Sequence, residues 1–232
     1  MKIVALIGAR SGSSLKDKNI RNYNGLPLLL HSVNQGLESK YITEIYVSTD
    51  SEKYAKIVKD YNSEIKVIMR PSEISGDLSN DYDFFKHYID SINNKPTIIV
   101  QLRPTYPNRN ANKIDECIKI FIENIDNYDS LRSVISLDKS AFKMYIKNEN
   151  SLIPFKNDGF NELSEPYNQA RQMLPQTYLH NGYIDIIKVE SLIKKKSITG
   201  DNIMAYVMND DENCDIDTLE DWEKSLNKHK ND

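Results

Sequence analysis

The sequence predicts an α/β fold with a doubly wound, mostly parallel sheet, and two observations support this prediction. Short apolar runs alternate along the chain with stretches whose apolar residues recur at helical spacing. The first apolar run ends in a loop of small and cationic residues, as strands do where an open α/β sheet binds a nucleotide. We expect residues 1–232 to form one domain, because no repeat, low-complexity tract or linker divides them.

The first half of the chain follows this alternation closely. Residues 3–7 form an apolar run that predicts a strand buried on both faces, and the run breaks at Gly8. Residues 27–37 follow an Asn-Gly turn and have apolar positions at helical spacing. Further strands are expected at 45–50, 65–69 and 97–102, and further helices at 51–61, 81–93 and 112–124.

The pattern changes from Ser133 onward. Residues 139–173 are irregular and rich in Lys, Asn, Glu and Tyr, so we interpret about 137–176 as an excursion from the sheet. This excursion could be a lid or a contact with another subunit. The remaining strands are expected at 134–136, 183–187 and 204–208, followed by a helix that begins at Leu219.

Composition narrows the class of partner. The chain is 39% hydrophobic and has a formal net charge of −4, whereas a general nucleic-acid binder is usually basic, so we expect no nucleic-acid partner. Neither a signal peptide nor a run near the roughly 18 apolar residues of a membrane span is visible. Cys117 and Cys214 form no metal-binding pattern and indicate a reducing compartment. We therefore expect a cytoplasmic protein without a membrane partner.

The loop after the first strand is the first candidate site. Its small residues are Ala9, Ser11, Gly12 and Ser13, and its cations are Arg10, Lys16 and Lys18. Small residues let a ligand approach backbone N–H groups, and the cations supply charge for phosphate. An ordinary solvated basic turn is the alternative. A dehydrogenase is a weak reading because the loop lacks the third glycine of that motif, and its three cations suit a triphosphate better.

Two acids near the end of the chain form the second candidate site. If 215–217 were a strand, Ile216 would point into the core, and Asp215 and Asp217 would project together on the other face. Two adjacent carboxylates repel each other unless a cation or protons intervene, and Mg²⁺ would suit them. The alternative is helix capping, because Thr218 with Asp221 resembles a capping box. Capping explains one acid but not both.

Polar residues beside apolar runs in the second half are weaker candidates. Arg171, followed by Gln172, could clamp a phosphate or carboxylate through its planar guanidinium, although a surface arginine in a long loop is the more common outcome. Asn181 and Gly182 form a similar polar insertion.

Taken in order, these pieces resemble the acylneuraminate cytidylyltransferase family, the CMP-sialic acid synthetases. The resemblance nearly spans the chain. The matching segments are ARSGS at 9–13 with KN at 18–19, VSTD at 47–50, RPSE at 70–73 with Asp77, RPTYP at 103–107 with Arg109, SVIS at 133–136, RQ at 171–172 through PQ at 175–176, NG at 181–182 and DID at 215–217. Each segment is weak alone, but the ordered set is specific.

The resemblance implies a Rossmann-like nucleotidyltransferase that transfers CMP from CTP to the anomeric hydroxyl of a 2-keto-3-deoxy sugar acid. It implies Mg²⁺ dependence and a homodimer whose arm after residue 136 crosses to the neighbour's site. Enzymes of this kind usually supply capsule, lipopolysaccharide or flagellar glycans. The implied catalytic residues are Arg10, Lys18 and Asp217, and the implied metal ligands are Asp215 and Asp217. The implied substrate-binding residues are Ala9, Ser11, Gly12, Ser13, Lys16, Asn19, Arg70, Asp77, Arg103, Thr105, Lys143, Arg171, Gln172 and Asn181.

Two departures from the family pattern keep alternatives open. Ser14 occupies a position where the family usually has lysine, and Arg103 stands where the sialic acid enzymes usually have glutamine. The acceptor is therefore expected among nonulosonic acids of the sialic, legionaminic or pseudaminic type. An eight-carbon ulosonic acid, another sugar, or a CTP-binding relative without catalysis are the alternatives.

Overall fold

The computed structural model describes the whole chain except residues 13–14, 156–162, 210–214 and 229–232. The fold comprises two compact units. The first unit is Met1–Ser133, Gly182–Tyr206 and Cys214–Asp232, and the second is Val134–Asn181 and Val207–Asn213. Within the described residues, no helix is both long and apolar enough to cross a membrane.

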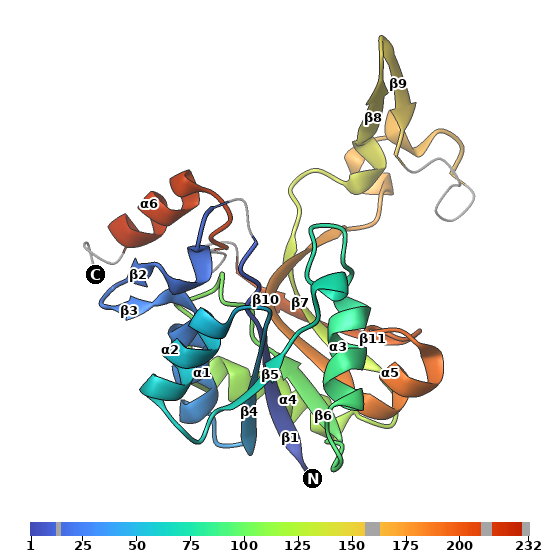
Figure 1. Cartoon of the computed structure of the whole chain (residues 1–232). Helices are drawn as coiled ribbons and strands as arrows, with labels where there is room; N and C mark the ends of the chain where they lie inside the picture. The colour runs from blue at the N-terminus through green and yellow to red at the C-terminus, as the bar shows by residue number, and fades with distance from the viewer. Residues whose placement is uncertain (13–14, 156–162, 210–214, 229–232) are drawn as a thin grey trace. The chain divides into compact units, whose positions relative to one another are not determined.

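A seven-stranded sheet organises the chain (Figure 1), with the strand order β11-β7-β10-β6-β1-β4-β5. Its strands are β1 (Ile3–Gly8), β4 (Glu44–Thr49), β5 (Lys66–Met69), β6 (Ile98–Gln101), β7 (Ser130–Ser136), β10 (Tyr178–Lys188) and β11 (Ile203–Met208). β1 pairs in parallel with β4 and with β6, and β4 pairs in parallel with β5, whereas β10 is antiparallel to β6. The predicted mostly parallel sheet is confirmed.

The helices follow the apolar periodicity of the sequence. They are α1 (Leu28–Glu38), α2 (Glu52–Tyr61), α3 (Asp81–Asp90), α4 (Ala111–Glu123), α5 (Val189–Lys195) and α6 (Leu219–Lys228). Polar residues cap three of them: the side chains of Ser51, Asn80 and Asn110 accept backbone N–H groups from the first turns of α2, α3 and α4. Short 3-10 turns lie at Lys18–Ile20, Ser72–Ile74, Ala141–Lys143, Pro166–Asn168 and Arg171–Met173.

The structure corrects the sequence-based assignment in three places. Residues 215–217 are not in a strand, and the Ile216 N–H donates instead to the Thr105 carbonyl at 3.0 Å. α5 was not expected, since a seven-residue helix offers barely two turns of periodicity. The strand expected at 183–187 begins at Tyr178, because the polar residues before it still extend the sheet.

The chain order of the sheet locates the site. From β1 the chain adds β4 and β5 on one side and then returns to place β6 on the other side of β1. This reversal is a topological switch point, and open α/β sheets bind ligands beyond the carboxyl ends of the strands at such a point. β1 is fixed there by its apolar run, whose residues Ile3–Ile7 are buried on both faces.

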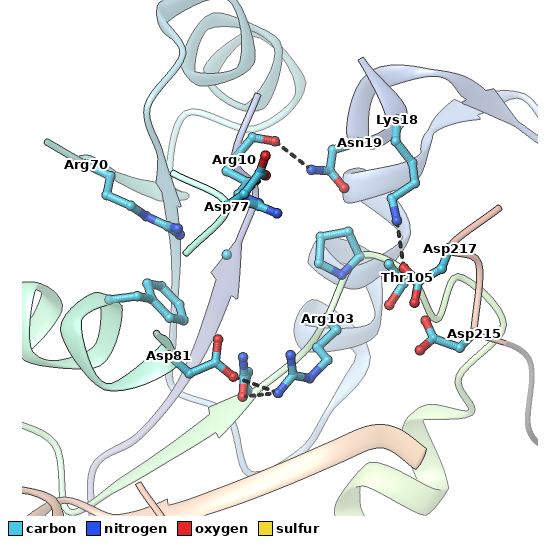
Figure 2. A pocket seen from close by; sticks show the side chains of 14 residues that line it. Arg10, Lys18, Asn19, Arg70, Asp77, Asp81, Arg103, Thr105, Asp215 and Asp217 are labelled. Carbon is cyan, nitrogen blue, oxygen red and sulfur yellow. Dashed lines mark hydrogen bonds and ion pairs between the residues drawn. The ribbon is translucent and has the colours of Figure 1, made fainter. Parts of the chain in front are cut away.

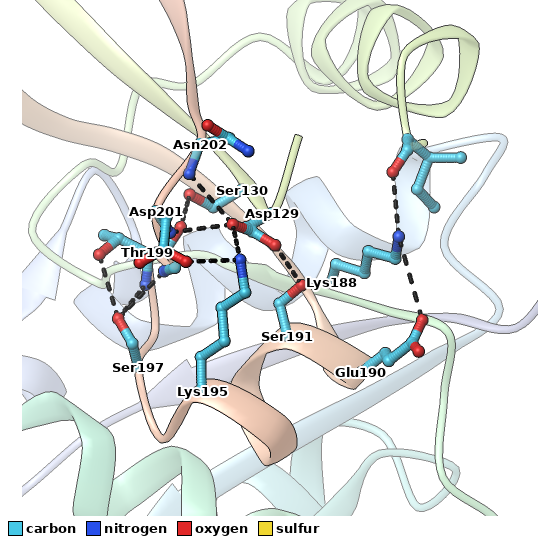
Figure 3. Close-up of polar contacts among 12 residues, drawn as sticks. Asp129, Ser130, Lys188, Glu190, Ser191, Lys195, Ser197, Thr199, Asp201 and Asn202 are labelled. Atoms are coloured by element: carbon cyan, nitrogen blue, oxygen red, sulfur yellow. Dashed lines mark hydrogen bonds and ion pairs between the residues drawn. The ribbon is translucent and has the colours of Figure 1, made fainter. Parts of the chain in front are cut away.

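A polar cluster around Asp129 ties together the start of β7, helix α5 and the loop before β11 (Figure 3). The Asp129 carboxylate accepts the Ser191 hydroxyl at 2.6 Å, the Lys195 ammonium at 2.7 Å and the backbone N–H groups of Asp201 and Asn202 at 2.9 and 3.0 Å. Burial alone would raise the pKa of this carboxyl, but its four donors outweigh burial and hold the pKa below its ordinary value.

Smaller elements complete the two units. In the first unit, β2 (Asn22–Tyr23) and β3 (Leu26–Pro27) form a short antiparallel pair. In the second unit, β8 (Tyr145–Asn148) and β9 (Ser151–Pro154) form a hairpin. The second unit contains most of the region expected to leave the sheet.

Candidate functional site

A cavity of about 520 Å³ opens in the first unit beyond the carboxyl ends of β1 and β6 (Figure 2), within the size range of small-molecule sites. Nine of its lining residues are among the sequence-predicted site residues: Arg10, Lys18, Asn19, Arg70, Asp77, Arg103, Thr105, Asp215 and Asp217. Sequence reasoning missed five others: Gly8, Asp81, Phe84, Gln101 and Pro104.

Arg10 lies at the start of the loop after β1. Its guanidinium donates to the Gly76 carbonyl at 2.8 Å and pairs with the exposed Asp77 carboxylate at 2.9 Å. The Asn19 side chain donates to the Arg10 carbonyl at 3.0 Å, which fixes the backbone of the loop. An ion pair with so exposed an acid adds little stability, so Arg10 can exchange Asp77 for an anionic ligand at low cost.

Lys18 is the buried cation of the cavity. Its side chain is only 7% exposed, and its ammonium donates to the Ile216 carbonyl at 3.0 Å and to the Asp217 carboxylate at 2.9 Å. These bonds tie the N-terminal loop to the acidic segment at 215–217. The Asp217 carboxylate is 66% exposed and faces the cavity, so it can also meet a ligand.

Helix α6 begins at a capping box. Thr218 and Asp221 form the capping box of α6, in which the Asp221 N–H donates to the Thr218 hydroxyl at 3.1 Å and the Thr218 N–H donates to the Asp221 carboxylate at 2.9 Å. The capping box therefore accounts for Thr218 and Asp221, while the Asp217 carboxylate pairs with Lys18 and Asp215 lines the cavity.

Asp215 carries a buried oxygen in need of a partner. Its Oδ1 atom has no hydrogen-bond partner among the described residues, although Thr105 hydrogen-bonds to the same carboxylate. Burial raises the pKa of Asp215, and the neighbouring Asp217 carboxylate adds to this, while the Thr105 bond opposes it. A cation beside the pair would relieve both the burial and the repulsion.

These acids fit Mg²⁺ rather than a metal held by protein alone. No cluster of three or more His, Cys, Asp or Glu side chains able to hold a metal occurs in the described part of the chain. Mg²⁺ typically takes one or two carboxylates and completes its shell with waters and substrate phosphates. The unpartnered oxygen of Asp215 and the exposed carboxylate of Asp217 match that donor set.

Arg70 lines the opposite side of the cavity, and Gly8 makes room for it. The Arg70 guanidinium donates to the Ser48 hydroxyl and carbonyl, both at 3.1 Å, and lies 4.5 Å from the centre of the Phe84 ring. A Cβ atom on Gly8 would lie 3.1 Å from this guanidinium and 3.2 Å from Phe84. Gly8 is thus needed for close approach at the end of β1.

Arg103 is anchored at the base of the cavity. One of its terminal nitrogens donates to Asp81 at 2.9 Å and to Gln101 and Asp185 at 3.3 Å. Burial alone would lower the pKa of this guanidinium, but the carboxylates of Asp81 and Asp185 outweigh burial and raise it. Arg132 also pairs with Asp185 at 3.3 Å, so two cations face two acids in this group.

A buried arginine supports the loop that presents Arg103 and Thr105. Arg109 donates to the Arg103 carbonyl at 2.6 Å and the Tyr106 carbonyl at 2.9 Å, and it also donates to the Tyr183 carbonyl. Burial lowers the pKa of Arg109 to about 9. The residue acts as scaffold: it is buried and does not line the cavity.

Four other loop residues predicted as ligand contacts, among those that the structure describes, do not line this cavity. Ala9 is buried and donates its N–H to the Ser48 carbonyl at 2.9 Å. Ser11 is held by Asp50, to which both its N–H and its hydroxyl donate at 2.7 Å. Gly12 has open space where a Cβ would be, and Lys16 is exposed. Ser13 lies outside the described residues, as does Ser14.

Four predicted residues belong to the second unit. Lys143 is exposed and donates to the carbonyls of Tyr167 and Gln169 at 3.3 and 2.8 Å. Arg171 and Gln172 are exposed on a 3-10 turn, whereas Asn181 is buried and donates to the Met208 sulfur at 3.5 Å. Their assignment as substrate contacts stays a prediction.

The missed residues could have been found only in part. Gln101 is the last residue of β6, at the strand end where ligands are expected, and Asp81 is the first residue of α3. Phe84 is an apolar residue on a helix face, which is indistinguishable from core in the sequence. What brings these three together is the fold, since none of them forms a motif with its chain neighbours.

The chain is similar in sequence to known cytidylyltransferases. The family model of the cytidylyltransferases matches residues 4–222. An N-acylneuraminate cytidylyltransferase of Escherichia coli O18:K1:H7 is 30% identical over 97% of the chain, but the chain spans only about half of that relative's length, 51%. A CMP-N,N'-diacetyllegionaminic acid synthase of Legionella pneumophila is 30% identical over 96% of the chain and 94% of that relative.

Among solved structures, a CMP:2-keto-3-deoxy-manno-octonic acid synthetase complexed with CTP has the same fold. The two chains superpose with a TM-score of 0.72 over 100% of this chain and 99% of the other, at 16% identity. At that identity the likeness concerns the fold alone.

Proposed function

The chain belongs to the cytidylyltransferase family, and from this premise we propose that it transfers CMP from CTP to the anomeric hydroxyl of a nonulosonic acid. One observation carries the proposal. At the switch point of the sheet, the cations Arg10 and Lys18 meet the acids Asp215 and Asp217 in one cavity. The relatives named for N-acylneuraminate and for diacetyllegionaminic acid support the class of acceptor.

The chemistry needs position and charge more than it needs a strong base. The sugar hydroxyl oxygen forms a bond to the α-phosphorus of CTP and releases its proton to solvent water. The bond from that phosphorus to the bridging oxygen breaks, and pyrophosphate leaves with the electron pair. Negative charge grows on the phosphate oxygens during this step. Arg10 and Lys18 would bind those oxygens and orient the triphosphate, and Arg70 would line the nucleotide pocket.

Asp215 and Asp217 would hold Mg²⁺. When bound, the ion neutralises charge on the phosphate oxygens and helps to template the reactants. The protein's own part is to aim both carboxylates into the cavity. Lys18 does this for Asp217 through their 2.9 Å ion pair.

Arg103 is the residue that we propose to shape acceptor choice. Its guanidinium already pairs with the carboxylates of Asp81 and Asp185. We therefore propose that Arg103 donates N–H groups to a neutral oxygen of the acceptor and does not bind an anionic group of the acceptor. The test is the ratio of kcat/KM for two nonulosonic acids in Arg103→Gln, with Arg21→Gln as control, because Arg21 donates to the Lys16 carbonyl and does not line the cavity. The expected result is a changed ratio only in the first variant, and an unchanged ratio in both would refute the assignment.

We further propose that the protein acts as a homodimer through its second unit. The hairpin and its flanking residues expose several large apolar side chains, of which Ile146, Leu152, Ile153 and Phe155 are the most exposed. Exposed apolar groups gathered on one small element are typical of an interaction surface. Light scattering on Leu152→Glu should report a shift toward the monomer; an unchanged mass would count against this surface.

A cytoplasmic location follows from the proposed donor, because CTP is a cytoplasmic metabolite.

The reaction is tested by pyrophosphate release in the presence of CTP and Mg²⁺ with candidate acceptors. Turnover on a sialic, legionaminic or pseudaminic acid, lost in Asp217→Ala, would support the proposal. Turnover on an eight-carbon ulosonic acid alone would replace the acceptor but keep the reaction. Tight CTP binding without turnover on any acceptor would favour the non-catalytic alternative.

A further inference from the structure

The segment at 215–217, which carries the two acids, is held by individual hydrogen bonds and not by regular secondary structure. Residues 215–217 belong to neither a helix nor a strand. The Ile216 N–H donates to the Thr105 carbonyl at 3.0 Å, and the Ile216 carbonyl accepts the Lys18 ammonium at 3.0 Å. Because no sheet ladder holds this segment, its position depends strongly on the helix that follows it.

That helix, α6, is attached through an apolar cluster beside the acids. Ile216 is fully buried together with Tyr23 and Leu28, and Trp222 and Leu226 of α6 pack against them. The Trp222 ring meets the Tyr23 ring edge-on, with 5.6 Å between their centres. Tyr23 therefore contacts both Ile216, the buried residue between the two acids, and α6, the helix that follows them.

A small polar group, the α6 latch, joins the same elements. It consists of Tyr23, Asn108 and Ser225. The hydroxyls of Tyr23 and Ser225, both on fully buried residues, are 2.6 Å apart, and the Asn108 amide donates to them at 2.9 and 3.2 Å. In so apolar a setting, a satisfied hydrogen-bond group of this kind fixes one arrangement of its partners.

The latch joins three segments, and each of them also supplies a cavity residue. Tyr23 lies in β2, five residues after Lys18. Asn108 lies in the loop three residues after Thr105, which bonds to Asp215. Ser225 lies in α6, which begins two residues after Asp217. The same three segments therefore meet twice, once at the latch and once at the acids.

We propose that the α6 latch is a positioning device for the metal-binding acids. Its residues act through Asp215 and Asp217 and do not contact the reactants. This inference rests on the proposed function, since it concerns the Mg²⁺ site named there. Without the latch, α6 and the acidic segment gain freedom, and the two carboxylates spend less time in the geometry that a cation and a triphosphate require.

The test measures how strongly a metal ion enhances CTP binding, without turnover. The dissociation constant of CTP for the full chain is measured by calorimetry in EDTA and again in saturating Mn²⁺, and bound Mn²⁺ is counted by its paramagnetic resonance signal. The latch variants are Tyr23→Phe and Ser225→Ala, which keep the packing. Alanine also favours helix formation, so the second variant does not weaken α6 through its backbone.

Two control variants match the chemistry of these changes elsewhere. Tyr88→Phe removes a buried hydroxyl that has no partner among the described residues. Ser191→Ala removes a buried serine hydrogen bond of 2.6 Å, from α5 to Asp129 in the polar cluster around that residue. Each control removes one hydroxyl, as the latch variants do. Ser191→Ala should also lower the stability about as much as Ser225→Ala does. Neither control residue touches α6.

The expected result is that Tyr23→Phe and Ser225→Ala lower the metal enhancement of CTP affinity by about three- to tenfold, the cost of one buried hydrogen bond. Their CTP affinity in EDTA should stay within about twofold of the parent, since the cationic groups are retained. Hydrogen exchange at the amides of 216–218 should rise in these variants and not in the controls.

The outcomes separate this inference from the proposed function. If the parent chain shows no metal enhancement of CTP binding, the proposed function fails. If the parent shows it, and the latch variants match Tyr88→Phe and Ser191→Ala in both enhancement and hydrogen exchange, the latch has no positioning role and the inference is overturned.

Discussion

Replacing Lys18 by methionine removes a buried positive charge but keeps a side chain of similar length and apolar stem. The lost ammonium donates to the Ile216 carbonyl and to the Asp217 carboxylate. Asp217 is 66% exposed, so water can solvate its carboxylate when the partner is gone. Desolvating the lysine is also no longer required, so we expect the free energy of unfolding to change by only about 1 kcal/mol.

The effect on turnover should be far larger than the effect on stability. Lys18 is the cation that the fold holds in contact with the acidic segment, where charge on phosphate is expected to grow. Removing one preorganised donor from a transition state that gains charge costs roughly 10²–10³ in kcat. We therefore expect pyrophosphate release to fall by about two to three orders of magnitude while the melting temperature moves by only about 2–4 °C.

The assay compares initial rates of pyrophosphate release with thermal unfolding for Lys18→Met and for Lys53→Met. Lys53 is an exposed cation near the same loop, paired with Asp17 at 3.2 Å, and it does not line the cavity. Its replacement should change the rate by less than about threefold. A folded Lys18→Met protein with a rate equal to that of the control would refute the assigned role of Lys18.

Three further predictions concern stability and nucleotide binding. Gly200→Ala should lower the free energy of unfolding by about 3–5 kcal/mol in a denaturant titration, because Gly200 has φ +65° and its Cβ would lie 2.4 Å from that of Asp129; Gly12→Ala, with open space, is the control, and equal losses in both would contradict this. The pKa of Asp129 is held below its ordinary value, so its contribution to stability is present above pH 3.8 and is lost as pH falls from there toward the lowered pKa. Acid unfolding of Asp129→Asn should therefore depend less on pH in that window, and an unchanged slope would exclude this role. Gly8→Ala should weaken CTP binding by roughly 3–30-fold in calorimetry by displacing the Arg70 guanidinium, which would be 3.1 Å away, and unchanged affinity would show that Arg70 tolerates the shift.

Local patterns in the sequence were enough to predict the sheet and most of its helices. The apolar run at 3–7 and the helical spacing at 27–37 depend on periodicity that neighbouring residues alone determine. α5 escaped prediction because seven residues are too few to show such a period. The segment at 215–217 is not the strand considered for it, because its alternation results from one buried residue, Ile216, and not from a sheet partner.

The residues of the cavity, too, could be predicted from the sequence only in part. The loop cations and the paired acids could be named from the sequence, because charge and small residues after a buried strand predict a ligand site. The group around Arg103 could not, because Asp81 and Asp185 come from a helix and a strand far apart in the chain. Only the tertiary fold shows that both acids pair with this arginine.

Pyrophosphate release is the most direct test of whether this chain transfers CMP to a nonulosonic acid. It would be measured with CTP, Mg²⁺ and a panel of sialic, legionaminic, pseudaminic and octulosonic acids. We expect release that requires CTP and one of the nonulosonic acids and that disappears in Asp217→Ala. Binding of CTP with no release on any acid in the panel, or release on the octulosonic acid alone, would contradict it.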